Sequence, residues 1–243
     1  ATVVNDAGLT FAASTVGGNL AATATTGNMT DSGALTIAGT SSFTTSASDA
    51  DITLDTTTNA FTGAVTLNTT GSSGNATIDN GTTALNIAAS SVGGTLSLRS
   101  GNDITDSGTV TVGGPWFSAT TDANNGNINM NTFAGRKITL TTHGTGNATI
   151  VNDTEILLTR MTIGGNLSVT ATTGIIGDSP SHNKSITVAG TSSFTTSANN
   201  ADIILDDTNH AFTGAVSLNT TGSSGHATID NGTTALNIAA SSV

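Results

Sequence analysis

Several residue types are scarce or missing in this chain of 243 residues, and each absence removes a class of protein. There is no cysteine, which excludes disulfide-stapled folds and cysteine-ligated metal centres. Only 5 basic residues stand against 16 acidic ones, which disfavours nucleic acid and anionic membranes because phosphate binding needs clustered Lys and Arg. No apolar run approaches the ~18–20 residues that a membrane span requires, so no transmembrane segment is predicted.

Charged residues make up 9% of the chain and aromatic residues 3%, a composition that in some proteins accompanies disorder. However, 35% of the residues are hydrophobic, and Val, Ile and Leu recur in short alternating runs. This pattern predicts a folded protein with a core. The absence of cysteine is also compatible with export through an oxidising periplasm.

Long internal repeats dominate the sequence. Residues 40–92 and 191–243 align without a gap at an offset of 151, with 8 differences over 53 positions. Residues 1–16 match the end of a repeat, and a Gly-Gly pair begins each repeat. The units defined in this way are 17–92, 93–163 and 164–243. Because both ends of the chain fall inside the array without a distinct capping sequence, we interpret 1–243 as a fragment of a single longer solenoid.

Apolar and polar residues alternate within each unit, as where Ile52 and Leu54 flank Thr53. A period of two is typical of strands with one buried face. The runs are separated by clusters of Gly, Asn, Asp, Ser and Thr, which favour turns. No stretch has the helical period of 3.6, so the sequence predicts an all-β protein with almost no helix.

Repetition without distinct ends favours a parallel β-helix, that is, a β-solenoid, over a β-sandwich. We expect about nine short strands per unit, grouped into three turns of roughly 25 residues that begin near Ala34, Ala60 and Ala84. Roughly ten turns for the whole chain follow from the same grouping. Crossover geometry favours a right-handed coil. Equivalent residues then stack. Phe61 and Phe212 occupy one repeat position and Phe43 and Phe194 another, so these aromatic side chains should lie in the core.

Three runs of sequence carry a resemblance to a known family: GGNLSVTATTG (Gly164–Gly174), SITVAGTSSFTTSA (Ser185–Ala198) and NHAFTGAVSLNTTG (Asn209–Gly222). They resemble the repeats of filamentous-haemagglutinin-type adhesins, which are large bacterial surface proteins secreted by two-partner or autotransporter routes. The resemblance covers nearly the whole chain. It implies a right-handed β-helical shaft, an outer-membrane secretion partner, an extracellular location at the bacterial cell surface, and a role in adhesion or biofilm.

The titratable residues give little sign of a metal centre. The four histidines are His143, His182, His210 and His226. His210 and His226 replace Asn59 and Asn75 of the sister repeat, so we expect solvated turns there rather than metal ligands. No HExxH pattern is present, and we predict no metal and no cofactor.

Aspartates recur at the ends of the expected strands: Asp31, Asp55, Asp79, Asp106, Asp178, Asp206 and Asp230. Stacked carboxylates are possible calcium ligands. The glycine-rich nonapeptide of calcium-binding β-rolls is missing, however, and Asp also caps turns through its own backbone. We therefore expect turn caps.

The middle unit is the only unduplicated one, and it holds the single tryptophan and four of the five basic residues. Trp116, Arg136 and Lys137 are the candidate ligand contacts, because a tryptophan beside cations can bind a sugar or an anionic surface. The alternative is that Trp116 fills a turn or the core of a divergent repeat. No catalytic residue is predicted, and we expect the protein not to be an enzyme.

These patterns favour a structural role. We expect a shaft or fibre segment of a surface adhesin that associates with itself end to end, with a host-surface, glycan or matrix ligand as a further partner. A module that binds ice or polysaccharide is the alternative, since threonine-rich strands offer ladders of hydroxyl groups. Asn-x-Thr sequences such as Asn75-Ala76-Thr77 leave glycosylation open.

Overall fold

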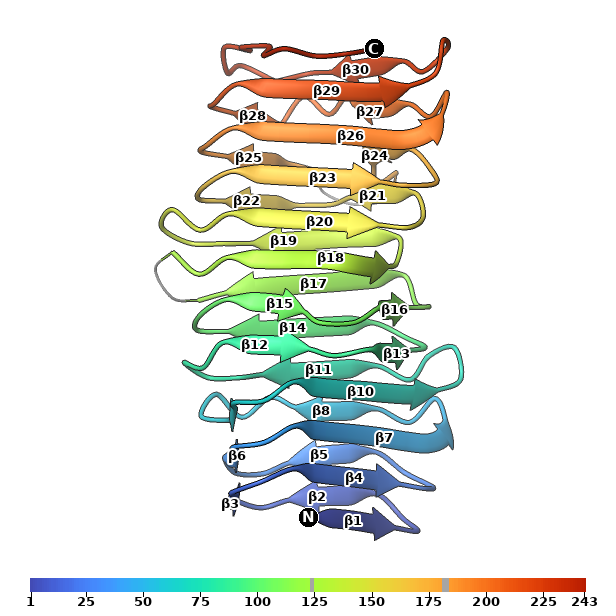
Figure 1. The fold of residues 1–243 in the computed structure, drawn as a ribbon, viewed down its shortest axis with the longest axis vertical. Coiled ribbons are helices and arrows are strands. Elements are labelled where there is room, and N and C mark those ends of the chain that lie inside the picture. Colours follow the sequence, from blue (N-terminus) through green and yellow to red (C-terminus); the bar gives the residue numbers. More distant parts are fainter. Residues whose placement is uncertain (123–124, 181–183) are drawn as a thin grey trace. The chain divides into compact units, whose positions relative to one another are not determined.

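The computed structural model describes residues 1–122, 125–180 and 184–243, and these ranges contain strands but no helix. The strands run parallel to their neighbours and stack as a β-solenoid of about 11 turns. The predicted fold class is thereby confirmed. The chain divides into two compact units, Ala1–Ala123 and Asn124–Val243 (Figure 1).

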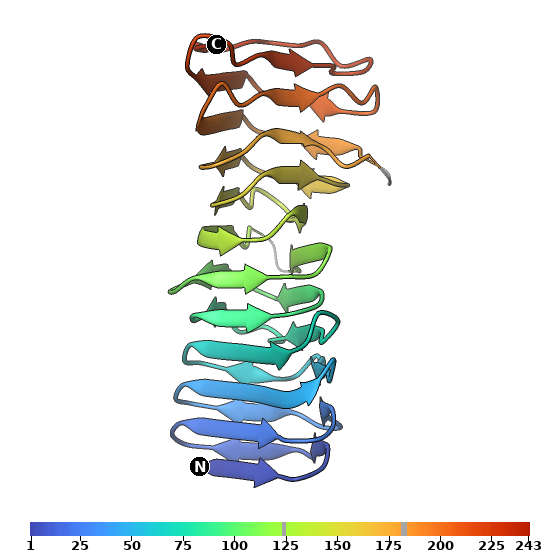
Figure 2. The same ribbon diagram turned by 90° about the vertical axis from the view of Figure 1, so that its right-hand side faces the viewer.

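The first unit contains two long sheets and a short one (Figures 1 and 2). Sheet A consists of β1 (Thr2–Asn5), β4 (Leu20–Ala24), β7 (Ser41–Ser48), β10 (Val65–Thr70), β12 (Leu85–Ile87), β13 (Ser90–Val92), β15 (Ile104–Asp106) and β16 (Val110–Val112). Sheet B consists of β2 (Leu9–Phe11), β5 (Met29–Asp31), β8 (Ile52–Leu54), β11 (Ala76–Asp79), β14 (Leu96–Ser100) and β17 (Trp116–Thr121). Sheet C consists of β3 (Ser14–Val16), β6 (Leu35–Ile37) and β9 (Ala60–Phe61).

The second unit is built in the same way from two sheets. Sheet D consists of β18 (Ile128–Ala134), β20 (Ala148–Asn152), β23 (Leu167–Ala171), β26 (Ser192–Asn199) and β29 (Val216–Thr221). Sheet E consists of β19 (Lys137–Thr141), β21 (Ile156–Leu158), β22 (Met161–Ile163), β24 (Ile176–Asp178), β25 (Ile186–Val188), β27 (Ile203–Leu205), β28 (Ala211–Phe212) and β30 (Ala227–Ile229).

The turns are shorter than the sequence suggested. Ala34 and Ala60 do begin stacked segments, since β6 pairs with β9 in sheet C. Ala84, by contrast, precedes β12, which pairs with β10 of sheet A. The expectation of three equal turns per unit was therefore wrong, because alternation reveals strands but not which strands lie above one another. Repeat 17–92 contains four successive positions of sheet A and three of sheet B, or three and a half turns.

Because a repeat contains a half-integral number of turns, equivalent positions of successive repeats lie on opposite sheets. Within the first unit, Gly17-Gly18 leads into β4 of sheet A, whereas Gly93-Gly94 leads into β14 of sheet B. Likewise Phe43 lies on β7 of sheet A and its counterpart Ala119 on β17 of sheet B. Both sheets are consequently built from the same kinds of residues.

Inward-pointing side chains form the core between the sheets. Phe11 of sheet B meets Phe43 of sheet A edge to face, with 6.3 Å between ring centroids, and Phe43 meets Phe61 at 5.6 Å. In the second unit Phe194 and Phe212 repeat this contact at 5.7 Å. Phe43, Phe61, Phe194 and Phe212 are fully buried, as predicted. Burial of each such ring contributes roughly 1.5–3 kcal/mol to stability.

Side-chain acceptors continue the hydrogen bonding between turns where the strands stop. Just before the sheet B strands, the Oδ1 atom of Asn28 accepts the N–H of Asp51, Asp51 accepts that of Asn75, and Asn75 that of Thr95, at 2.7–2.9 Å. Asn127, Asn147 and Asn166 form the same series before sheet D. Each turn is thus bonded to the next through turns as well as strands.

A buried carboxamide also recurs at one corner of each repeat. The Asn80 side chain is fully buried, accepts the Phe61 N–H at 2.6 Å and donates to the Phe61 carbonyl at 3.1 Å. Asn231 makes the same pair of bonds with Phe212. Asn152 does so with the backbone of Gly135. These amides take the place of strand pairing where the chain bends.

His210 contradicts the expectation of a solvated turn, since it is only 2% exposed. Its Nδ1 atom accepts the Ile186 N–H at 3.1 Å, and its Nε2 atom lies 3.2 Å from Asp178 Oδ2. The sister residue Asn59 is equally buried. Its Oδ1 atom accepts the Leu35 N–H at 2.8 Å and its Nδ2 atom donates to Asp31 at 2.6 Å. Neutral imidazole protonated on Nε2 therefore reproduces the carboxamide, one acceptor and one donor.

This equivalence predicts which substitutions position 210 tolerates. We expect His210→Asn to change the free energy of unfolding by less than about 1 kcal/mol, since the same bonds can form. His210→Leu should cost at least about 2 kcal/mol, because it leaves the buried Ile186 N–H without an acceptor and removes the imidazole from Asp178 Oδ2. Urea unfolding followed by circular dichroism measures both, with Asn59→His as the reciprocal control. Equal stability of the Leu and Asn variants would contradict the assignment.

Candidate functional site

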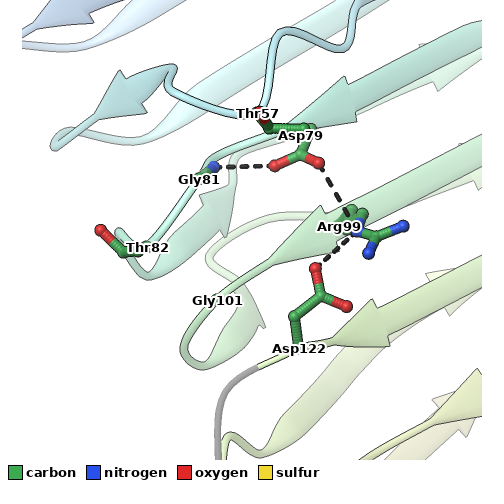
Figure 3. Close-up of a pocket in the computed structure, with 7 residues that line it drawn as sticks. All are labelled: Thr57, Asp79, Gly81, Thr82, Arg99, Gly101 and Asp122. Atoms are coloured by element: carbon green, nitrogen blue, oxygen red, sulfur yellow. Dashed lines mark hydrogen bonds and ion pairs between the residues drawn. The ribbon is translucent and has the colours of Figure 1, made fainter.

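A polar groove of about 340 Å³ lies beside sheet B of the first unit (Figure 3). Four consecutive turns form it, through the loop after β8, which holds Thr57, and through the ends of β11, β14 and β17 and the loops that follow them. Its lining residues are Thr57, Asp79, Gly81, Thr82, Arg99, Gly101 and Asp122. Parallel stacking creates the groove, because Asp79 lies directly opposite Arg99 and Arg99 opposite Thr120, two residues before Asp122.

The charged side chains of this groove alternate in sign along the stack. Arg99 Nε donates to Asp122 Oδ2 at 2.5 Å and lies 3.5 Å from Asp79 Oδ2. Asp79 Oδ1 accepts the Gly81 N–H at 2.8 Å, which is the Asx turn expected of these aspartates. The Arg99 side chain is 57% exposed, whereas that of Asp79 is 9% exposed. A buried carboxyl therefore sits behind an accessible guanidinium.

Burial shifts the acid–base properties of this pair. Desolvation raises the pKa of Asp79 above 3.8, and Asp122 and Asp55 add to this rise, while the Gly81 N–H and Arg99 oppose it. The hydrogen bond to Asp122 raises the pKa of Arg99. Arg99 is thus charged at every accessible pH and holds its partners in place.

The three charged residues replace neutral residues of the neighbouring repeat. With the Gly-Gly pairs aligned and the strand registers compared, Asp79 corresponds to Val4, Arg99 to Thr23 and Asp122 to Ser46. Val4 and Thr23 lie on sheet A, opposite to the groove. The solenoid framework therefore does not require the charges. An internal comparison of repeats is the signal that would have pointed to them from the sequence.

The candidate residues Trp116, Arg136 and Lys137 are distributed over both units. Trp116 begins β17 in the first unit and is half-buried, at the opposite end of that strand from Asp122. Arg136 and Lys137 belong to the second unit, where Arg136 forms an ion pair with Glu155. Neither unit holds the three residues by itself. Trp116, Arg136 and Lys137 do not line the groove, although its residues Arg99, Gly101 and Asp122 also belong to the middle repeat.

The other candidate ligands occupy simpler positions. His143 and His226 are exposed, as expected of turns, and His182 lies outside the described residues. Within the ranges that the structure describes, no three His, Asp or Glu side chains are grouped so as to hold a metal ion. No helix in these ranges has the length and apolarity to cross a membrane.

The Asn-x-Thr sequences follow from the architecture. In Asn75-Ala76-Thr77 the asparagine belongs to the inter-turn series, Ala76 points into the core and Thr77 is on the outer face. The Asn75 Nδ2 atom already donates to Asp51 at 3.0 Å. The frequency of these sequences therefore needs no glycosylation to explain it.

The raised pKa of Asp79 predicts a pH-dependent effect of Asp79→Asn. The folded chain binds this proton more tightly than the unfolded chain, so the corresponding stability is present below pH 3.8 and is lost as pH rises through the folded-state pKa. We expect the stability of Asp79→Asn relative to the original protein to increase as the pH rises above 3.8. Trp116 fluorescence during urea unfolding reports on this unit.

Arg99→Gln provides the control for this measurement. Arg99 lowers the pKa of Asp79, so Arg99→Gln should raise that pKa further. In the Arg99→Gln background, the stability difference caused by Asp79→Asn should therefore change more with pH. A stability difference that does not vary with pH in either background would contradict the role of burial.

A model of repeats of unknown function (DUF5649) matches residues 1–68, 73–144 and 145–219. No curated protein and no solved structure matches the chain.

Proposed function

The chain belongs to the family of repeats of unknown function (DUF5649), and we propose that it is a structural segment, the shaft or fibre of a large secreted bacterial surface adhesin. The in-register bonding of each turn to the next carries this proposal. Backbone pairing and the series from Asn28 to Thr95 give successive turns the same attachment, so length can grow by repetition. The proposal includes a role in adhesion, biofilm or filament formation.

The extracellular assignment rests on composition and on resemblance. A hydroxyl-rich composition with few charged residues and no cysteine suits secretion, and the runs at 164–174, 185–198 and 209–222 are similar to the repeats of filamentous-haemagglutinin-type adhesins. A secretion partner in the outer membrane belongs to the same proposal. We propose no catalytic role for the protein. Labelling of a cytoplasmic compartment alone, by antibodies against this chain, would contradict the location.

Self-association is the partner interaction that the structure favours. Among the described residues, β1 pairs with β4 alone and β30 with β27 alone, so each has a strand edge without a neighbouring strand. The last turn also exposes apolar side chains, with Leu236 at 41% and Ile238 at 48%. Open strand edges beside apolar side chains favour the addition of another turn, whether from a further repeat of the same chain or from a second copy.

We expect this chain to form linear oligomers in a concentration-dependent manner. Replacing Leu236 and Ile238 with Lys should reduce association, because two charges would have to be buried at each contact. Ile204→Lys is the matched control, since Ile204 is 38% exposed but lies on an inner strand. Sedimentation velocity gives the size distribution. Monomers at all concentrations, or equal loss of association in the control, would contradict end-to-end contact.

Ice binding is the second candidate, and one observation favours it. Six successive strands of sheet B carry an outward hydroxyl at the same register: Thr10, Thr30, Thr53, Thr77, Ser97 and Ser118. The row is only one residue wide on these short strands. A thermal hysteresis assay distinguishes the two functions, since a shaft without ice affinity leaves the freezing point unchanged.

A further inference from the structure

The groove between Asp79 and Asp122 has unused hydrogen-bonding capacity. Asp79 Oδ2 is 3.5 Å from Arg99 Nε, which is longer than a hydrogen bond, so this buried carboxyl keeps an open acceptor position. Both carboxylates approach Arg99 through Nε. In Figure 3 no dashed line joins a terminal nitrogen of the guanidinium to either carboxylate. The acceptor Asp79, the donor Arg99 and the acceptor Asp122 thus follow one another over three turns.

Charge selects among the ligands that could fill these positions. An anion would meet the carboxylates of Asp79 and Asp122, and a cation would meet the guanidinium of Arg99. A neutral polyhydroxyl compound suits both, because each hydroxyl group donates one hydrogen bond and accepts others. Thr57 and Thr82 add hydroxyl groups to the lining.

The shape of the groove is compatible with a small ligand. Its volume of about 340 Å³ lies within the range of small-molecule sites, about 300–1,000 Å³. Gly81 and Gly101 leave the wall without side chains, and a Cβ atom on Gly101 would come within 2.7 Å of the Gly81 carbonyl oxygen. Close contact between turns therefore keeps this wall bare.

We propose that this groove binds a neutral sugar unit of a glycan. Asp79 and Asp122 accept hydrogen bonds from sugar hydroxyls, and the terminal nitrogens of Arg99 donate to them. Arg99 and Asp122 replace Thr23 and Ser46 one repeat earlier, so the stacking of turns does not require these two charges, while Asp79 also caps the turn at Gly81. The shaft function requires no such ligand, and the two proposals stand or fall separately.

Titration with neutral trisaccharides tests the proposal. Maltotriose, cellotriose and mannotriose are added to the isotopically labelled chain at up to about 10 mM, which detects millimolar dissociation constants. We expect at least one of them to produce saturable NMR shifts at Gly81, Gly101 and neighbouring amides. A sulfated disaccharide and a hexuronate trimer serve as anionic probes and should not bind there.

Variants separate a sugar site from an internal ion pair. Arg99→Gln should weaken binding at least tenfold, and Asp122→Asn should weaken it as well. Arg160→Gln and Asp6→Asn are charge-matched controls at exposed positions outside the groove and should leave binding unchanged. Circular dichroism verifies that each variant is folded. If Arg99→Gln does not fold, Arg99→Lys, which keeps the charge, replaces it in the binding measurement.

Three results would overturn the proposal. These are the absence of saturable binding by all three neutral sugars, binding of the anionic probes alone, and neutral-sugar binding that survives both groove substitutions. In the last case the sugar binds elsewhere on the chain.

Discussion

Hydrogen bonding of each turn to the next, in register, is the constraint on which the rest of this structure depends. A parallel stack leaves no freedom to shift one strand by one residue, because a shift would turn the apolar face of that strand toward water. The strands satisfy the constraint through their backbones. Outside the strands, Asn28, Asp51 and Asn75 satisfy it through side-chain oxygens. The need for side-chain oxygens that accept backbone hydrogen bonds explains why polar residues are so common in the chain.

The same constraint explains the buried polar side chains. Asn80 and His210 lie at corners where the backbone cannot pair with the turn below, and each supplies an acceptor for a backbone N–H. A buried donor without a partner costs about 1–3 kcal/mol, so such corners demand a side chain with an acceptor and a donor at fixed positions. Asparagine and neutral histidine both meet that demand. Glycine pairs complete the stack where backbones come close.

A repeat of three and a half turns gives both sheets of the first unit similar residues, and a distinct site then requires departures from the repeat. The groove beside Arg99 is such a departure, since charged residues occupy three positions that are neutral one repeat earlier. The chain accordingly combines a repeated framework with individual side chains that occur at one place only.

The sequence predicted the parts of the structure that depend on alternation. Ile52, Thr53 and Leu54 read as a strand with one buried face, and Phe43 and Phe61 as core residues, because burial follows directly from the period of two. Turn length was not predictable in this way, since strand pairing depends on three-dimensional register. The burial of His210 was missed because exchange with asparagine resembles a loop substitution. The groove was missed because Asp79, Arg99 and Asp122 are distant in sequence and meet only when turns stack.

Disulfide formation between introduced cysteines tests the stacking of turns most directly, since the chain has no cysteine of its own. Thr53 and Thr77 are register partners on adjacent parallel strands. Such strands lie about 4.8 Å apart, within the Cα separation of about 4.4–6.8 Å that a disulfide allows. Thr30 and Thr77 are two turns apart, beyond that reach. The account predicts that Thr53→Cys with Thr77→Cys oxidises to an intramolecular disulfide, whereas Thr30→Cys with Thr77→Cys stays reduced. Cross-linking of the second pair, or failure of the first in the folded protein, would contradict it.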